Sequence, residues 1–130
     1  MKSLQIGFQK SSLNFLVARE QKLFEQQFPN TKIEWREFPA GPQMLEALAV
    51  GAVDFGYVGN TPPIFAQAAD KNLSYAGYEV YPEKSLGLVL PNNSSIKSVS
   101  DLKGKRIALQ KGSSAHEFLA KVLQKANLSW

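Results

Sequence analysis

Strand-like and helix-like segments alternate three times along the first half of this chain, and no other sequence feature restricts the fold as much. Residues 4–8 alternate apolar and polar side chains, as a strand with one buried face does, and residues 33–36 and 53–58 also have strand character. Apolar side chains at helical spacing follow the first strand from residue 13 to 28, where Pro29 stops the pattern. Strands separated by helices in this way are parallel and joined by helical crossovers. The alternation predicts an α/β fold, in which an open and mainly parallel sheet carries helices on both faces.

Prolines and a glycine mark the bounds of the next two expected helices. Pro42 and Pro62 suit a first helical turn, because proline lacks the N–H that a helix start leaves unpaired. Gly51 suits the end of the helix that begins at Pro42. A further strand-like segment follows at residues 73–81.

The character of the sequence changes after that segment. An apolar, strand-like run at residues 86–90 precedes a polar, turn-rich stretch at residues 91–95. We interpret this change as a boundary, with residues 1–88 forming a first α/β lobe and residues 89–130 forming a crossover and an incomplete second lobe. The second part contains segments typical of a short helical turn, a strand and an amphipathic helix: residues 99–102, residues 106–110, and Phe118, Leu119, Val122, Leu123 and Ala126 on one helix face.

The composition restricts the possible chemistry and location. Fifteen Lys and Arg residues against 11 Asp and Glu give a net charge of +4, and the basic residues are scattered, so an anionic small ligand is as compatible as nucleic acid. Cysteine is absent, which excludes disulfides, thiolate metal sites and a cysteine nucleophile. No apolar run approaches the ~18 residues of a membrane span, and no signal-peptide core follows Met1. We expect a soluble chain whose export leader, if it has one, has been removed.

Three loops share one chemical character, because each offers hydroxyl or amide groups directly before a helix. They are residues 9–12, residues 59–61 and residues 112–114. In open parallel sheets, ligands bind at the carboxyl ends of strands, where loops meet helix N-termini whose unpaired N–H groups favour an oxyanion. The alternative is that Ser, Thr and Asn in these loops are ordinary N-caps, which is the commoner role for any single loop. Three such loops together favour an anion site.

The sequence does not contain the motifs of nucleotide binding, acid–base catalysis or calcium binding. The Gly-x-Gly-x-x-Gly pattern is missing, and residues 104–106 lack the upstream glycine and the Ser or Thr of a phosphate loop. His116 is the only histidine, and a lone histidine in a first helical turn is more often a surface or cap-region residue than a general base, with contact to a ligand as the next alternative. The carboxylates form no cluster suited to calcium or to paired acid–base work. We therefore expect no enzyme activity, no bound metal and no cofactor.

Three collinear segments carry a family resemblance: residues 38–48 (FPAGPQMLEAL), residues 62–68 (PPIFAQA) and residues 101–116 (DLKGKRIALQKGSSAH). They resemble the aliphatic sulfonate-binding proteins, the periplasmic substrate-binding components of ABC importers and relatives of the taurine- and nitrate-binding proteins. The similarity runs from Leu4 to about Leu128, and the third segment is the most specific. Its first five residues occur in many binding proteins of this fold, so they indicate the superfamily more than the ligand.

The resemblance implies a lobe of the type II periplasmic-binding-protein fold, in a two-lobed protein that closes on its ligand like a hinged clamp and has crossing strands near Val89. It also implies a periplasmic location, a small organosulfonate as ligand, an ABC permease in the inner membrane as partner, and no nucleic acid. In this family the binding groups come from loops after strands. The matching positions here are Gln9, Ser11, Asn60, Thr61, Ser113, Ser114 and His116.

Two departures and several alternatives accompany the resemblance. Family members are more than twice this length, which implies a truncated chain, and Asn60 stands where close relatives look acidic. The same fold serves enzymes similar to the pyrimidine-precursor synthases of thiamine biosynthesis, and effector-sensing domains of transcription regulators. A half-length chain could also assemble as a domain-swapped homodimer through exposed lobe surfaces. Alkanesulfonate, taurine, sulfate ester and nitrate all present an oxyanion that such a site would bind.

Overall fold

The computed structural model describes residues 2–80, 82 and 85–130, which form two compact units. We call Met1–Ser74 unit 1 and Tyr75–Trp130 unit 2. The expected lobe boundary after residue 88 stays a prediction.

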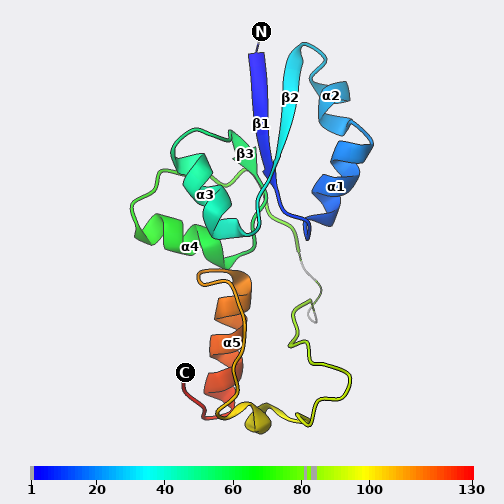
Figure 1. The fold of residues 1–130 in the computed structure, drawn as a ribbon. Helices are drawn as coiled ribbons and strands as arrows, with labels where there is room; N and C mark the ends of the chain where they lie inside the picture. Colours follow the sequence, from blue (N-terminus) through cyan, green and yellow to red (C-terminus); the bar gives the residue numbers. More distant parts are fainter. Residues whose placement is uncertain (1, 81, 83–84) are drawn as a thin grey trace. The chain divides into compact units, whose positions relative to one another are not determined.

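Unit 1 is built on a parallel sheet of three strands (Figure 1). The strands are β1 (Lys2–Phe8), β2 (Thr31–Glu37) and β3 (Phe55–Gly56), in the order β2-β1-β3. Both pairings are parallel, and Ile6 of β1 lies opposite Trp35 on one side and Phe55 on the other. The parallel sheet predicted from the alternation of segments is therefore confirmed.

Aromatic side chains cover one face of this sheet. Helices α1 (Leu13–Glu20) and α2 (Leu23–Gln27) lie on that face. The Phe15 ring centroid is 5.8 Å from that of Phe55, and the Phe24 centroid is 5.4 Å from that of Trp35. Aromatic pairs at such distances add to the free energy of burial, by about 0.5–1.5 kcal/mol each.

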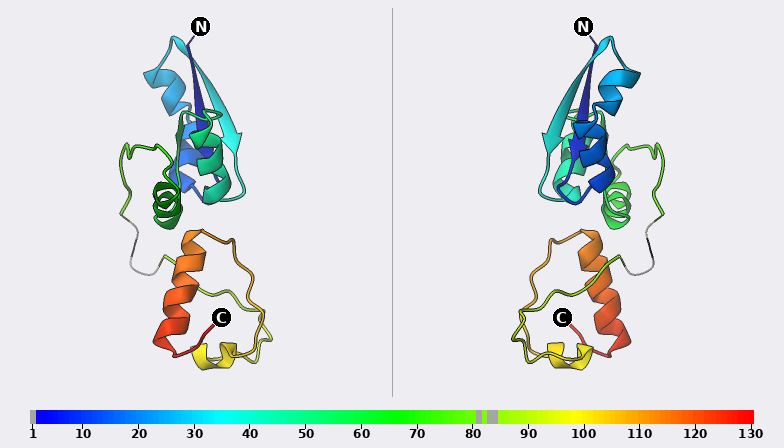
Figure 2. Two further views of the ribbon diagram at one scale, coloured as in Figure 1. Left: turned by 90° about the vertical axis from the view of Figure 1, so that its left-hand side faces the viewer. Right: turned by 90° about the vertical axis from the view of Figure 1, so that its right-hand side faces the viewer.

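Helix α3 (Gly41–Ala49) covers part of the opposite face, where its buried Met44 packs on glycines of β1 and β3. Helix α4 (Thr61–Ala68) follows β3, and its beginning contacts the beginning of α3. Helices on both faces of the sheet, seen from three directions in Figures 1 and 2, confirm the layer order expected from sequence.

Three expectations for unit 1 were wrong in detail. The helical pattern over residues 13–28 is two helices, because Lys22 takes a left-handed conformation (φ 53°) that ends one helix and begins the next. The strand expected over residues 53–58 is regular only at residues 55–56, after which the chain leaves the sheet. The described part of the segment at residues 73–81 forms no strand, because no neighbouring strand pairs with it; Tyr81 lies outside the described residues.

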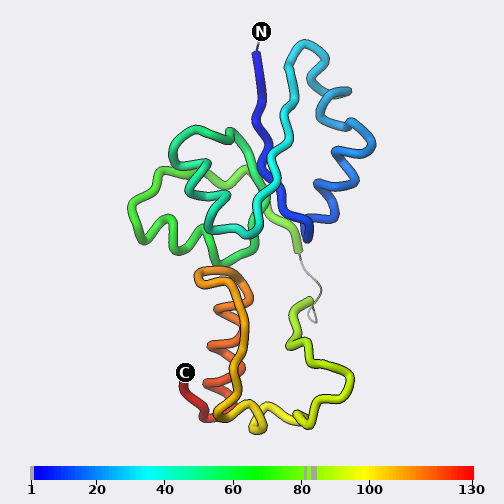
Figure 3. Tube along the Cα trace, viewed as in Figure 1, coloured from blue at the N-terminus to red at the C-terminus, as the bar shows by residue number. Residues whose placement is uncertain are grey.

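Unit 2 contains the short helix η1 (Val99–Leu102) and the helix α5 (Ser114–Lys125), both expected from sequence. Its buried side chains come from these two helices: Leu102, Leu119 and Leu123. The strands expected at residues 86–90 and 106–110 do not form, because an apolar run becomes a strand only where another strand pairs with its main chain. Val89 is instead 95% exposed. The irregular path from residue 85 to residue 98 can be followed in Figure 3.

Candidate anion-binding site

The strand order of unit 1 creates one favoured position for a ligand. From β1 the chain crosses to β2 through α1 and α2 on one face, and it returns to β3 through α3 on the other face. The crossover that leaves β1 and the crossover that leads to β3 thus lie on opposite faces of the sheet. Open α/β sheets bind ligands in the crevice at the carboxyl ends of two neighbouring strands with this arrangement. The loops that leave these ends are residues 9–12 and residues 57–61, which we call the switch-point loops.

A hydrogen bond joins the two switch-point loops. The side-chain amide of Gln9 donates from Nε2 to the main-chain oxygen of Tyr57 at 3.2 Å. The loop that contains Gln9 is also closed on itself, because the N–H of Gln9 donates to Ser12 Oγ at 3.3 Å and the N–H of Ser12 donates to the Gln9 oxygen at 2.9 Å. Ser12 is buried by these contacts, whereas Ser11 stays exposed.

The residues at the N-cap positions do not act as ordinary side-chain caps. Ser12, Asn60 and Ser113 occupy the N-cap positions of α1, α4 and α5, and none of the three makes a side-chain cap hydrogen bond. A cap role would have required such a bond to the N–H of the second or third helical residue. The capping alternative therefore does not hold for these three side chains.

The beginning of α4 offers side-chain donors more than backbone donors. Thr61 is its first residue and is 5% exposed, and Pro62 and Pro63 follow without backbone N–H groups. The Thr61 hydroxyl lies 3.5 Å from Asn60 Oδ1. The sequence predicts that unpaired N–H groups at this helix start bind an anion, and the two prolines reduce the number of such groups.

One residue near this site was not predicted. Gln43 lies in the first turn of α3, and its Oε1 is buried without a hydrogen-bond partner among the described residues. A buried amide oxygen without a partner costs about 1–3 kcal/mol, so such groups are rare in native proteins. The signal was present in the sequence, because residues 38–40 link a strand to the helix that carries Gln43, just as the three chosen loops link strand-like segments to helices.

In unit 2, the loop before α5 is held by its own side chains. The Ser113 hydroxyl donates to the Gln110 oxygen at 2.7 Å, and the N–H of Gly112 donates to His116 Nδ1 at 3.1 Å. His116 is therefore an acceptor at Nδ1 and helps to hold this loop. Ser114 Oγ is buried without a partner among the described residues.

The structure thus brings together two of the three loops that were expected to contact a ligand, those before α1 and α4. Gln9 contacts the loop that leads to Asn60 and Thr61, all within unit 1. Ser11 lies in the same loop as Gln9 but is exposed. That Ser113, Ser114 and His116 of unit 2 serve the same ligand stays a prediction.

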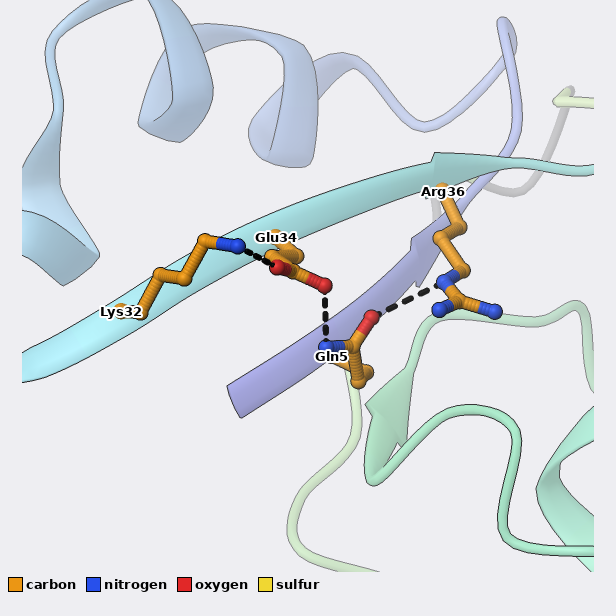
Figure 4. Close-up of polar contacts among 4 residues, drawn as sticks. All are labelled: Gln5, Lys32, Glu34 and Arg36. Carbon is orange, nitrogen blue, oxygen red and sulfur yellow. Dashed lines mark hydrogen bonds and ion pairs between the residues drawn. The ribbon is translucent and has the colours of Figure 1, made fainter. Parts of the chain in front are cut away.

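A charged cluster joins β1 and β2 across the sheet (Figure 4). Lys32, Glu34 and Arg36 alternate along β2, and Gln5 of β1 bonds to both Glu34 and Arg36. Hydrogen bonds from Lys32 and then from Gln5 hold the pKa of Glu34 below its usual value. Because each charge in the cluster has a partner of opposite charge or an amide, we interpret it as cross-strand stabilisation.

Metal binding and membrane spanning find no support in the part of the chain that the structure describes. No three His, Cys, Asp or Glu residues there come together as a metal site. No helix there has the length and apolar character needed to cross a membrane.

Comparison with known proteins places this chain in a family. Residues 9–130 match the family model described as NMT1/THI5 like. The chain belongs to the NMT1/THI5-like family. An aliphatic sulfonates-binding protein of Escherichia coli (strain K12) is 49% identical over 128 residues, which are 98% of this chain and 40% of that protein.

Two solved structures resemble this NMT1/THI5-like chain. The alkanesulfonate-binding protein SsuA from Xanthomonas axonopodis pv. citri, bound to MOPS, is 51% identical, with a TM-score of 0.93 over 99% of this chain and 45% of that one. The periplasmic aliphatic sulphonate binding protein SsuA from Escherichia coli is 49% identical, with a TM-score of 0.81 over 99% of this chain and 42% of that one. The chain spans about 40% of the length of the curated relative that heads the comparison. The resemblance to aliphatic sulfonate-binding proteins and the α/β fold of a partial periplasmic-binding-protein lobe are confirmed.

Proposed function

We propose that this chain is part of a substrate-binding protein that captures a small organosulfonate for ABC-type import and does not change it chemically. The observation that carries the proposal is the set of helix starts at the switch-point loops and before α5, whose N-cap side chains make no cap bonds. These residue types bind oxyanions by hydrogen bonding and need no metal or cofactor.

The chemistry of a sulfonate suits these groups. A sulfonate is ionised across the physiological pH range and presents three acceptor oxygens. Hydroxyl and amide donors such as Thr61 and Asn60 form charge-assisted hydrogen bonds with it, worth about 1.5–3 kcal/mol each. Asn60 adds no negative charge at the edge of the site, so it does not repel the anion.

The relatives support the same ligand class. The structure with 51% identity holds MOPS, a molecule that carries a sulfonate group, and both SsuA proteins are named for sulfonates. From these names we infer a periplasmic location and an ABC permease in the inner membrane as partner. Within this proposal Ser113, Ser114 and His116 belong to the binding groups of the full-length protein, together with Gln9, Ser11, Asn60 and Thr61.

An enzymatic role on the same fold is the second candidate. A synthase of the thiamine pathway type would need a reactive cysteine or additional histidines, whereas this sequence has no cysteine and one histidine. The Nδ1 atom of that histidine already accepts the N–H of Gly112. Binding without chemistry therefore agrees better with the residues present.

Isothermal titration calorimetry of the full-length protein tests the proposal, with methanesulfonate, hexanesulfonate, taurine, sulfate and nitrate as titrants. We expect an alkanesulfonate to bind most tightly, and Thr61→Ala to weaken its binding by about tenfold or more, the effect of losing one charge-assisted bond. Thr61→Ser should restore most of the affinity. Ser3→Ala, a hydroxyl deletion at the opposite end of β1, is the matched control. Absence of alkanesulfonate binding, or equal affinity of wild type and Thr61→Ala, would contradict the proposal.

A further inference from the structure

Two glycines on neighbouring strands make room for one methionine. Gly7 of β1 and Gly56 of β3 are Cα partners in the parallel pairing. A Cβ on Gly7 would lie 2.8 Å from Met44 Cγ, and a Cβ on Gly56 would overlap Met44 Sδ. Met44 is fully buried. We call the space above this glycine pair the glycine hollow; it exists only because neither strand carries a side chain there.

The glycine hollow lies directly before both switch-point loops. Gly7 is two residues before the loop at residues 9–12, and Gly56 is one residue before the loop at residues 57–61. The N–H of Tyr57 donates to the Gly7 oxygen at 3.3 Å, so the pairing of the two strands continues to the first residue of the second loop. The depth at which Met44 sits therefore affects the two strand ends that hold the loops.

Met44 also connects the sheet to α4 through its own helix. Gly41, the first residue of α3, packs against α4 so closely that a Cβ there would lie 2.7 Å from Pro62 Cγ and 3.3 Å from Val58 Cγ1. Pro62 follows Thr61 directly. A shift of α3 away from the sheet would thus be transmitted to the second switch-point loop and to the Thr61 hydroxyl.

We propose that Met44, seated in the glycine hollow, is a positioning residue for the anion site. The proposal rests on the proposed function. It adds an explanation of how the two switch-point loops are held in position relative to each other. Met44 does not touch the ligand. It fixes the depth of α3, and through α3 it fixes the beginning of α4. Close packing of this kind transmits small displacements, because protein interiors leave no free space to absorb them.

Gly56→Ala tests the proposal by adding a Cβ where Met44 Sδ now lies. In the full-length protein we expect the affinity for an alkanesulfonate to fall about tenfold or more, because α3 must move outward. Adding Met44→Val removes Sδ and Cε, the two Met44 atoms that the new Cβ would meet, and keeps branched carbon at the Cγ position over Gly7. We expect this double variant to return to within about threefold of the wild-type affinity. Met44→Leu alone keeps the side-chain volume but branches at Cγ, next to Gly7; we expect a loss of several-fold.

Val53→Ala is the control for a general loss of stability. Val53 is buried like Met44, with 1% of its surface exposed, and it lies on the amino side of β3, away from the loops. We expect Val53→Ala to lower the melting temperature and to leave the alkanesulfonate affinity within about twofold of wild type. Equal losses of affinity in Val53→Ala and Gly56→Ala, or a double variant as weak as Gly56→Ala, would overturn the positioning role.

A measurement without ligand separates this proposal from the proposed function. Amide hydrogen exchange in residues 57–61 reports how firmly the second switch-point loop is held. We expect faster exchange there in Gly56→Ala, a return to the wild-type rate in the double variant, and no change in Val53→Ala. If wild type bound no sulfonate, the proposed function would fail while this experiment still decided whether Met44 holds the loop. Unchanged exchange in Gly56→Ala would refute the positioning role.

Discussion

Gln9 Nε2 donates a hydrogen bond of 3.2 Å to the main-chain oxygen of Tyr57, and this bond joins the first residue after β1 to the first residue after β3. The two strands already lie side by side, but their pairing ends at this point. Gln9 therefore extends the connection beyond the sheet, to the place where the candidate ligand groups begin. This bond uses one of the two hydrogens of the Gln9 side-chain amide.

From the Gln9–Tyr57 bond we predict that Gln9→Glu strongly weakens the binding of an alkanesulfonate. The carboxylate cannot donate to the Tyr57 oxygen, and it places a negative charge beside a site for an anion. We expect a loss of alkanesulfonate affinity of about tenfold or more by calorimetry, and a smaller loss for Gln9→Ala. Gln26→Glu is the matched control, because Gln26 Nε2 also donates to a main-chain oxygen, that of Gln21, on an exposed surface. Similar losses in both Glu variants would refute a role specific to Gln9.

The left-handed residue between α1 and α2 predicts a stabilising substitution. Lys22 has φ 53°, a conformation that costs a residue with a Cβ about 1–2 kcal/mol and costs glycine almost nothing. We expect Lys22→Gly to change the free energy of unfolding by between 0 and about +1 kcal/mol, because glycine also gains entropy in the unfolded chain. Gln21→Gly, at φ −85°, should destabilise instead. Urea denaturation measures the free energy of unfolding of both variants. A Lys22→Gly protein less stable than wild type would disprove the expected relief of backbone strain.

The parts of the fold that sequence analysis predicted well are those set by local periodicity. Alternation in residues 4–8 and prolines near the starts of α3 and α4 gave the order of elements, and parallel strands followed from the crossovers. The place of the candidate site was inferred from this order, since the carboxyl ends of parallel strands meet at one edge, and it stays a prediction. The break at Lys22 did not follow, because a left-handed non-glycine residue leaves no mark in an apolar pattern.

The parts that could not be predicted depend on contacts distant in sequence. The apolar run at residues 86–90 indicates burial in some partner but does not name one, and among the described residues no strand pairs with it. The orphan Oε1 of Gln43 likewise depends on which side chains surround it after folding. By contrast, the missing N–H groups of Pro62 and Pro63 are visible in the sequence itself, because proline has no backbone N–H.

The carboxylate of Asp101 predicts how unit 2 responds to acid. Its Oδ2 accepts the N–H of Lys97 and the N–H of Ser98 at 2.9 Å each, and the Ser98 hydroxyl at 3.0 Å. These bonds lower the pKa of Asp101 from its ordinary value of 3.8. Because the folded pKa is the lower one, the stabilisation is fully present above about pH 4 and is lost as the pH falls through the folded value.

We expect the stability of unit 2 to fall with pH below about 4, and Asp101→Asn to weaken that dependence. The measurement is a series of denaturant unfolding curves between pH 2 and 6, with a carboxyl titration followed by NMR. Asp70→Asn is the control, an exposed carboxylate in unit 1. A titration of Asp101 at or above its ordinary value would contradict the expectation.

Two neighbouring serines before and in the first turn of α5 predict opposite effects on stability. Ser113 Oγ donates to the Gln110 oxygen, so Ser113→Ala removes a bond and should destabilise by about 0.5–1.5 kcal/mol. Ser114 Oγ is buried without a partner among the described residues, so Ser114→Ala removes an unsatisfied group and should leave the ligand-free protein equally or more stable.

When an alkanesulfonate binds, we expect the Ser114 hydroxyl to donate to one of its oxygens. Ser114→Ala should then weaken binding, although it does not destabilise the free protein. We expect Ser114→Ala to lose about tenfold in affinity while gaining or keeping thermal stability in the free state. Thermal unfolding with and without ligand measures both quantities on one sample. A Ser114→Ala protein that is less stable when free would show that the hydroxyl already has a structural partner, and one that binds the alkanesulfonate as tightly as wild type would remove Ser114 from the proposed site.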